Sequence, residues 1–201
     1  MTTKLILGAG LAALLLPAAA SGEPTDREVQ AIMKRDFHPH GQATMDRLDQ
    51  DAVQRVCTDT RNKPPAELAK TLEADQYKTI RFPEGSLLGD WKKGAAIAWS
   101  GRGMQWQDDP KKPSGGGCYN CHEIGPERTS FGTIGPSLKQ FGKLRGNTPG
   151  MQRYVYGKIY NAKAYSLCSE MPRFGYTRSL TEQQMKDLTA YLLDPASPVN
   201  K

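Results

Sequence analysis

Apolar residues recur every three or four positions along most of the 201-residue chain, and this spacing is typical of amphipathic helices. No segment alternates between apolar and polar residues as a half-buried strand would. The pattern therefore predicts an all-α chain with long loops. The helical pattern runs through segments 25–37, 43–57, 64–74, 90–99, 148–160 and 180–194.

The last of these segments, SLTEQQMKDLTAYLLDP, has the clearest end signals. Thr181 and Gln184 have the spacing of a capping box, and Leu180 and Met185 have that of a hydrophobic staple. Asp194 with the following proline ends the pattern. We expect a well-defined C-terminal helix.

The N-terminus indicates an exported protein. One basic residue, Lys4, precedes an apolar run and then three small residues, which is the layout of a secretory signal peptide. The run is too short to cross a membrane, which takes about 20 apolar residues, so we expect residues 1–22 to be removed in the periplasm.

The remaining chain divides into three parts by its pattern. Residues 23–84 form a helical N-terminal extension, whose third helix is expected to bury Leu68 and Leu72. Residues 85–195 form the main domain, and residues 196–201 a short tail. A Gly-, Pro- and Lys-rich stretch between Gly101 and Gly117 is predicted to be a loop inside the main domain.

The formal net charge of +6 indicates anionic protein partners or substrates rather than nucleic acid in an exported protein, although a solvated basic surface explains it equally well. Four basic residues are candidates to steer such partners: Lys111, Lys112, Lys143 and Arg173.

The chemistry is concentrated in the motif CYNCH. Cys118, Cys121 and His122 spell C-x-x-C-H, the attachment signature of a c-type haem. Two thiols on one turn can each form a thioether with a haem vinyl group, and the histidine is then held next to the iron. The alternative is a zinc site in which these cysteines join Cys57 and Cys168. Structural zinc more often uses two C-x-x-C pairs, so we favour one covalently bound haem.

A haem ligand needs support and apolar surroundings. A ligating imidazole usually donates its second N–H to a carbonyl, and the following GTIGPSL segment offers the carbonyl of Pro136 for His122. Six apolar residues are candidates for the walls, although each could equally be an ordinary core residue: Phe131, Ile134, Leu138, Tyr154, Phe174 and Leu188.

Met171 is the best candidate for the sixth iron position. It lies in a loop about fifty residues after the motif, and Pro172 restricts its backbone to non-helical geometry. Histidine and methionine together raise the haem potential. The competitors are His38 and His40 in the extension, and the thiolate of Cys168. The methionines 33, 45, 151 and 185 lie on apolar helical faces and are expected in the core, and Met104 precedes the haem motif.

The two remaining cysteines have a use that leaves no thiol for iron. In an exported protein, cysteines not tied to a cofactor tend to pair. We therefore expect a Cys57–Cys168 disulfide that ties the extension to the methionine loop.

From about Gly85 to Leu193 the order of features resembles class I cytochromes c, and more narrowly the SoxX subunits of sulfur-oxidising bacteria. The residues that carry this resemblance are GDWKKGAAIAW, CYNCHEI, GTIGPSLKQFG, MPRFG and LTEQQMKDLTAYLL. It implies a class I cytochrome c fold, one haem c on Cys118 and Cys121, and His122 and Met171 as axial ligands.

The same resemblance implies a function in a complex. It implies a periplasmic heterodimer with a SoxA subunit, which joins thiosulfate oxidatively to a cysteine of the SoxYZ carrier, an L-cysteine S-thiosulfotransferase reaction. The catalytic site would belong to SoxA, and this chain would pass electrons to an acceptor such as a small cytochrome c. The sequence shows no nucleophile or acid–base pair of its own. A free-standing electron shuttle is the alternative.

Overall fold

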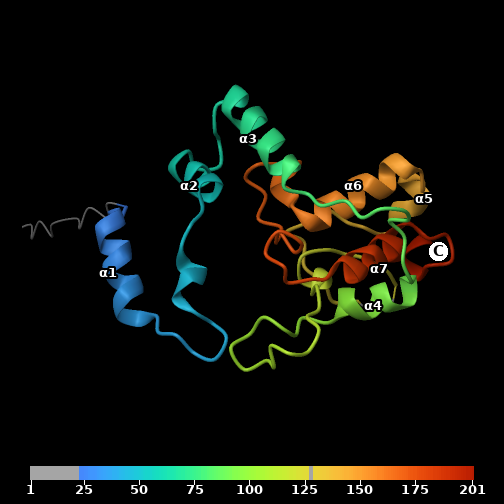
Figure 1. Cartoon of the computed structure of the whole chain (residues 1–201), viewed down its shortest axis with the longest axis horizontal. Coiled ribbons are helices and arrows are strands. Elements are labelled where there is room, and N and C mark those ends of the chain that lie inside the picture. The colour runs from blue at the N-terminus through green and yellow to red at the C-terminus, as the bar shows by residue number, and fades with distance from the viewer. Residues whose placement is uncertain (1–22, 127–128) are drawn as a thin grey trace, which may run out of the picture. The chain divides into compact units, whose positions relative to one another are not determined.

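The computed structural model describes residues 23–126 and 129–201, so the predicted signal peptide lies outside the described residues. The all-α prediction is confirmed in these ranges, which contain no strand. The α-helices are α1 (Asp26–Asp36), α2 (Ala52–Asp59), α3 (Ala66–Lys78), α4 (Trp91–Trp99), α5 (Phe141–Arg145), α6 (Pro149–Tyr160) and α7 (Glu182–Leu193), shown in Figure 1. Short 3-10 helices cover Met45–Leu48, Cys118–Asn120, Ala162–Ala164 and Pro198–Asn200.

The chain separates into two compact units at Phe37 and His38. In the first unit, Thr25 and Glu28 form a capping box that starts α1. The apolar face of α1 is exposed in the structure, including Ile32 and Phe37. The second unit holds everything from His38 onward. The domain boundary at residues 84 and 85 stays a prediction.

Helices α4 and α7 pack closely against each other, and glycines make this possible. The main chain of α7 at Asp187 lies where Gly94 of α4 would carry a Cβ atom, so any side chain there would overlap the α7 backbone. A Cβ atom on Gly89 would meet the same residue. The buried Asp187 carboxylate accepts a hydrogen bond of 2.8 Å from the backbone N–H of Asp90. The GDxxxG pattern is therefore a helix-crossing motif, in agreement with the predicted class I cytochrome c fold.

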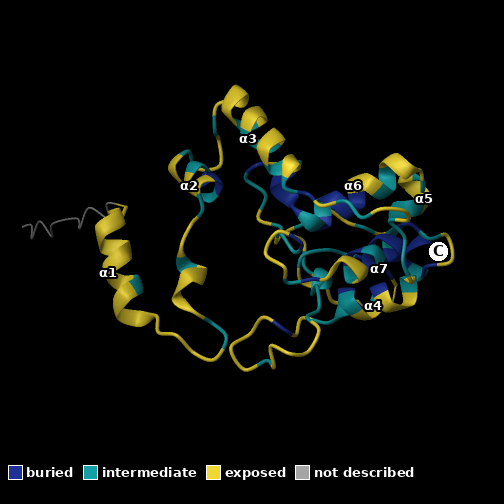
Figure 2. Ribbon diagram, in the orientation of Figure 1, coloured by how far each residue is buried: buried dark blue, intermediate teal, exposed yellow. Residues whose placement is uncertain are grey.

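The main core lies between α4, α6 and α7, where Figure 2 shows the buried residues gathered on α6 and α7. The predicted capping box of α7 forms: Thr181 accepts from the Gln184 N–H, and Gln184 reaches back to the Thr181 N–H. Leu180 and Met185 of the expected staple are both buried. The C-terminal residues also pack against this core. Val199 is buried, and its carbonyl accepts a hydrogen bond from the backbone N–H of Gln140.

The N-terminal extension differs from its prediction in two details. The pattern at 43–57 is not one helix: it breaks at Asp49, and Asp51 starts α2 as its N-cap. Leu68 is exposed rather than buried, and α3 packs against the disulfide region through Ala69 and, one turn further along, Leu72.

The extension also packs against the loop that precedes the haem motif. The Gln42 amide donates to the carbonyls of Gly103 and Gln105, at 3.3 and 2.7 Å. The His40 ring stacks on Trp106 with 3.9 Å between ring centroids. The N-terminal extension and the loop between Gly101 and Gly117 thus contact each other.

In the part of the chain that the structure describes, we find no helix with the length and apolar character to cross a membrane.

Candidate haem site

One apolar cavity brings together three of the four residues predicted to hold the haem, and Cys121 does not line it. It has a volume of about 40 Å³. Its lining residues come from α4, α6 and α7, from the segment 118–138 and from the loop that carries Met171. Cys118, His122 and Met171 all line it. Of the six candidate wall residues, Leu138, Phe174 and Leu188 line the cavity.

The other three candidate wall residues lie elsewhere. Ile134 is 81% exposed and Phe131 is also exposed, while Tyr154 packs edge-on against Tyr165 with 5.2 Å between ring centroids. Ile134 belongs to the segment that supports His122. A porphyrin bound beside His122 would cover the exposed Ile134 side chain.

The local backbone shapes the haem motif. Gly117 adopts a left-handed conformation with φ of 55°, which begins the 3-10 turn Cys118–Asn120. The His122 N–H donates to the Cys118 carbonyl at 3.0 Å. This turn directs Cys118 and His122 to the same cavity. Burial raises the pKa of the Cys118 thiol to about 12, so the thiol is neutral at physiological pH.

The His122 ring is held at its Nδ1 atom. Its Nδ1 lies 2.6 Å from the carbonyl oxygen of Pro136. A carbonyl only accepts, so Nδ1 carries the hydrogen and Nε2 keeps its lone pair for a metal. Gly135 lies against the ring, and a Cβ atom there would overlap it. The Gly135 N–H donates to the Cys121 carbonyl at 2.8 Å, which fixes the supporting segment to the motif.

Met171 approaches the cavity from the loop between α6 and α7. Its N–H donates to the hydroxyl of Ser169 at 3.3 Å. After Met171, the N–H groups of Gly175 and Tyr176 both donate to the Tyr160 carbonyl at 3.1 Å. Gly175 packs against the Tyr160 ring, with no space for a side chain. The glycine of MPxFG thus lets the loop return against α6.

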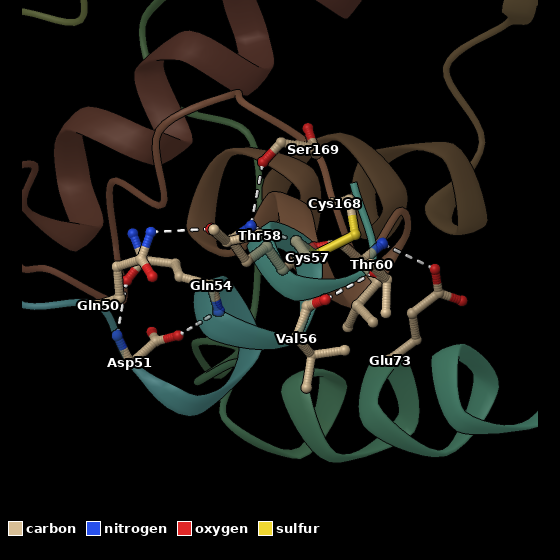
Figure 3. Close-up of a disulfide and its surroundings, with 12 residues drawn as sticks. Gln50, Asp51, Gln54, Val56, Cys57, Thr58, Thr60, Glu73, Cys168 and Ser169 are labelled. Carbon is tan, nitrogen blue, oxygen red and sulfur yellow. Dashed lines mark hydrogen bonds between the residues drawn. A yellow bond between two sulfur atoms is a disulfide. The ribbon is translucent and has the colours of Figure 1, made fainter. Parts of the chain in front are cut away.

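A disulfide joins Cys57 of α2 to Cys168 of this loop, 111 residues away (Figure 3). Next to it, the backbone N–H of Leu167 donates to the Glu73 carboxylate of α3 at 2.8 Å. Both contacts tie the extension to the loop three or four residues before Met171.

The zinc alternative loses its ligands in this arrangement. Cys57 and Cys168 are joined to each other, and zinc needs thiolates. Among residues 23–126 and 129–201, no three His, Cys, Asp or Glu side chains gather at a point that could hold a metal ion.

The competitors for the sixth iron position lie away from the cavity. His40 stacks on Trp106, and Cys168 is in the disulfide. Met45 and Met104 are exposed, so the core placement expected for Met45 is wrong, because the 3-10 turn at Met45–Leu48 replaces the expected helix. Met185 is in the core, as expected.

The set of steering residues needs one correction. Lys111, Lys112 and Lys143 are exposed, but the Arg173 side chain is only 9% exposed. Arg173 pairs with Asp51, so it is a buried structural group and not a surface charge.

The donor set fits a haem c: the Cys118 thiol, an imidazole fixed in one tautomer and the Met171 thioether line one apolar space, and Cys121 follows directly after the 3-10 turn that carries Cys118. The enclosed volume is smaller than a porphyrin, so the exposed rim, including Ile134, would have to cover the rest of the group. Sequence reasoning missed Asp51, Glu73 and Gly135 as parts of the site. The glycine was present in the GTIGPSL motif, whereas the two carboxylates gave no local signal.

The chain was compared with protein families, with known proteins and with solved structures. No family model matches the chain. Over 159 residues the chain is 38% identical to a protein named "Uncharacterized lipoprotein" of Aquifex aeolicus (strain VF5), and the alignment covers 76% of this chain and 73% of that protein. The crystal structure of SoxXA from P. pantotrophus is similar with a TM-score of 0.41 and 23% identity, covering 59% of this chain and 95% of that one.

Proposed function

The chain belongs to the same family as the lipoprotein of Aquifex aeolicus, and for this member we propose electron transfer by one covalently bound haem c. The observation that carries the proposal is the meeting of Cys118, His122 and Met171 at one apolar cavity. These residues come from a single motif and from a loop about fifty positions away.

Each residue has a role in this proposal. Cys118 and Cys121 would attach the haem through thioethers, with each S–H adding across a vinyl group. His122 would bind the iron through Nε2 while Pro136 holds Nδ1–H, and Met171 would supply a second iron ligand from the same cavity. When bound, the haem supplies a one-electron couple between ferric and ferrous iron. The apolar walls Leu138, Phe174 and Leu188 exclude water, which together with the thioether favours the ferrous state.

We further propose the finer role implied by the resemblance: the electron-transfer subunit of a periplasmic SoxAX complex. Thiosulfate would be joined to the SoxYZ carrier at the SoxA subunit, and this chain would take the electrons onward. The support is that each motif behind the resemblance has a structural role in this chain. Gly94 of GDWKKG, Gly135 of GTIGPSL and Gly175 of MPRFG each permit a close contact. The relative is named a lipoprotein, which agrees with export.

Covalent haem is tested by staining for haem after denaturing electrophoresis of protein made with a haem-attachment system. We expect a stained band at the mass of the mature chain. A Cys118→Ala, Cys121→Ala double variant is the control and should lose the stain. An unstained wild-type band would refute the haem.

Met171 is tested by Met171→Ala in the purified haem protein. We expect a lower reduction potential and an iron open to external ligands, because the thioether raises the potential. An unchanged spectrum and potential would refute its role. Met104→Ala is the matched control, since Met104 is an exposed methionine away from the cavity.

The partner is tested by native mass and by co-purification from cells grown on reduced sulfur. A second haem protein should accompany the chain. A lone monomer that exchanges electrons would favour the free-standing shuttle instead.

A further inference from the structure

The loop that carries Met171 is held by buried charges as well as by the disulfide. Lys163, in the 3-10 turn Ala162–Ala164, is 7% exposed. Its ammonium group donates to the carbonyls of Leu167 and Ser169, at 3.1 and 3.3 Å. These two carbonyls flank Cys168, so Lys163 fixes the backbone on the N-terminal side of Met171.

Arg173 fixes the other side. Its Nη2 pairs with the Asp51 carboxylate, and its guanidinium carbon lies 4.3 Å from the centroid of the Tyr176 ring. Its Nη1 is buried and has no hydrogen-bond partner among the described residues. Asp51 is therefore the carboxylate that compensates this buried cation, and removing it would leave a charge unpaired in the interior.

Asp51 has two tasks on one carboxylate. Its Oδ1 accepts from the Gln54 N–H at 2.8 Å and so starts α2, while its Oδ2 binds Arg173. Six residues later α2 carries Cys57. Figure 3 shows Asp51, Cys57 and Cys168 together around this helix. The same short helix thus contacts the loop at Cys168 and at Arg173, on both sides of Met171.

The Asp51–Arg173 pair is partly buried, with 9% of the Arg173 side chain and 32% of the Asp51 side chain exposed, and such a pair brings little net stability because its charges must leave water. Its best-attested use is to specify one arrangement among several. The pair here joins residues 122 positions apart and ends two residues from the proposed iron ligand. We propose that Asp51 is a positioning residue for Met171: through Arg173 it holds the loop in the one arrangement that keeps the thioether at the cavity that His122 also lines. This inference rests on the proposed haem ligation.

The consequence is competition at the iron. Without Asp51 the loop samples arrangements in which Met171 has left, and an external ligand such as imidazole binds the ferric iron in those states. The apparent affinity for imidazole rises in proportion to the population of such states. The reduction potential falls for the same reason, because the thioether favours the ferrous form.

The experiment compares Asp51→Asn with wild type as purified ferric holoproteins. Asparagine is a good N-cap, so α2 keeps its start, while the charge and the second acceptor oxygen that binds Arg173 are lost. The control is Asp75→Asn, which removes the partner of Lys78 in an exposed pair on α3. We measure imidazole affinity, the thioether–iron absorption band and the reduction potential. We expect imidazole to bind about tenfold more tightly to Asp51→Asn, with a weaker band and a lower potential, and no change in Asp75→Asn.

A second variant, Asp51→Leu with Arg173→Met, removes both charges and so folds without an unpaired cation. We expect it to show the same tighter imidazole binding. If wild type has the thioether band and both variants match it in band, potential and imidazole affinity, the positioning role is refuted while the haem ligation stands. If wild type lacks the band and Met171→Ala changes nothing, the ligation fails and the inference falls with it.

Discussion

The two sides of the apolar cavity are held by parts of the chain at very different distances along the sequence. His122 is supported by the Pro136 carbonyl 14 residues away and by Gly135, inside one contiguous segment. Met171 lies in a loop tied to Cys57 and Asp51, at separations of 111 and 122 residues. The histidine side is therefore built from local contacts, and the methionine side depends on the N-terminal extension.

This difference suggests different responses to damage. A substitution in a local contact should displace the residue that it supports and leave the rest of the fold unchanged. A support made of distant contacts fails in stages, because the disulfide, the Glu73 contact and the Asp51 pair act on the same loop. Four changes, taken from the largest expected effect to the smallest, would break or sharpen this comparison.

Gly135→Val should have the largest effect and should act on the histidine side alone. Any Cβ atom at Gly135 overlaps the His122 ring, so the imidazole has to leave its place against the Pro136 carbonyl. We expect loss of the low-spin haem spectrum and a chain whose helical content is retained. Absorption and circular dichroism spectra measure the two effects.

Gly150→Val is the matched control, because a Cβ atom at Gly150 meets only the Thr148 hydroxyl at 4.0 Å. A Gly135→Val protein with an unchanged haem spectrum would contradict the tight support of His122.

Replacing Cys57 and Cys168 together by serine should lower the free energy of unfolding by about 2–5 kcal/mol, because the disulfide closes a long loop in the unfolded chain. We expect a second effect that Gly135→Val lacks: tighter imidazole binding, since the methionine loop is released. Denaturant unfolding and ligand titration measure them. Equal imidazole affinity before and after the change would show that the loop is held without the extension.

The same difference between local and distant contacts decides which features could be predicted from the sequence. The C-x-x-C-H motif, the Pro136 carbonyl and the capping box of α7 are local patterns, so their residues could be named in advance. The Cys57–Cys168 pair was a long-range prediction, and it was possible because the haem motif uses the other two of the four cysteines.

The contacts that could not be predicted are those between distant polar residues. From the sequence alone, Asp51 and Arg173 are each expected on the surface, as most charged residues are. Nothing in the sequence around either residue indicates a partner 122 positions away. The break at Asp49 was missed for a related reason: the apolar spacing continues across it, and only the capping box of Asp51 with Gln54 separates the two turns.

Glu73→Ala should have an intermediate effect on the methionine side. It removes the acceptor of the Leu167 N–H, and Leu167 is buried, so we expect a loss of about 1–3 kcal/mol in the free energy of unfolding. Glu73→Gln keeps an acceptor oxygen and should recover most of the loss. Glu67→Ala, an exposed residue of the same helix, is the control for helix propensity. Denaturant unfolding of all three distinguishes a lost hydrogen bond from a weaker helix, and equal losses in Glu73→Ala and Glu67→Ala would contradict the anchor.

The smallest expected effect is the acid dependence of the Asp51 pair. Partial burial works to raise the pKa of the Asp51 carboxyl, but the Gln54 N–H and the Arg173 guanidinium together hold the pKa below its ordinary value. A carboxyl whose pKa is lower in the folded chain binds fewer protons there than in the unfolded chain. Its contribution to stability is therefore full above the unfolded pKa of about 3.9 and disappears as the pH falls through the folded pKa.

Wild type and Asp51→Asn should therefore differ in thermal unfolding midpoint at pH 6, and the difference should shrink below about pH 4. Asp75→Asn, which changes an exposed carboxylate of α3, should show a much smaller difference at both pH values, because exposed pairs contribute little. A difference between wild type and Asp51→Asn that stays constant down to pH 3 would mean that the Asp51 charge does not hold the loop. The tie from α2 would then be reduced to the disulfide, and the two sides of the cavity would differ in one covalent bond rather than in a network of distant contacts.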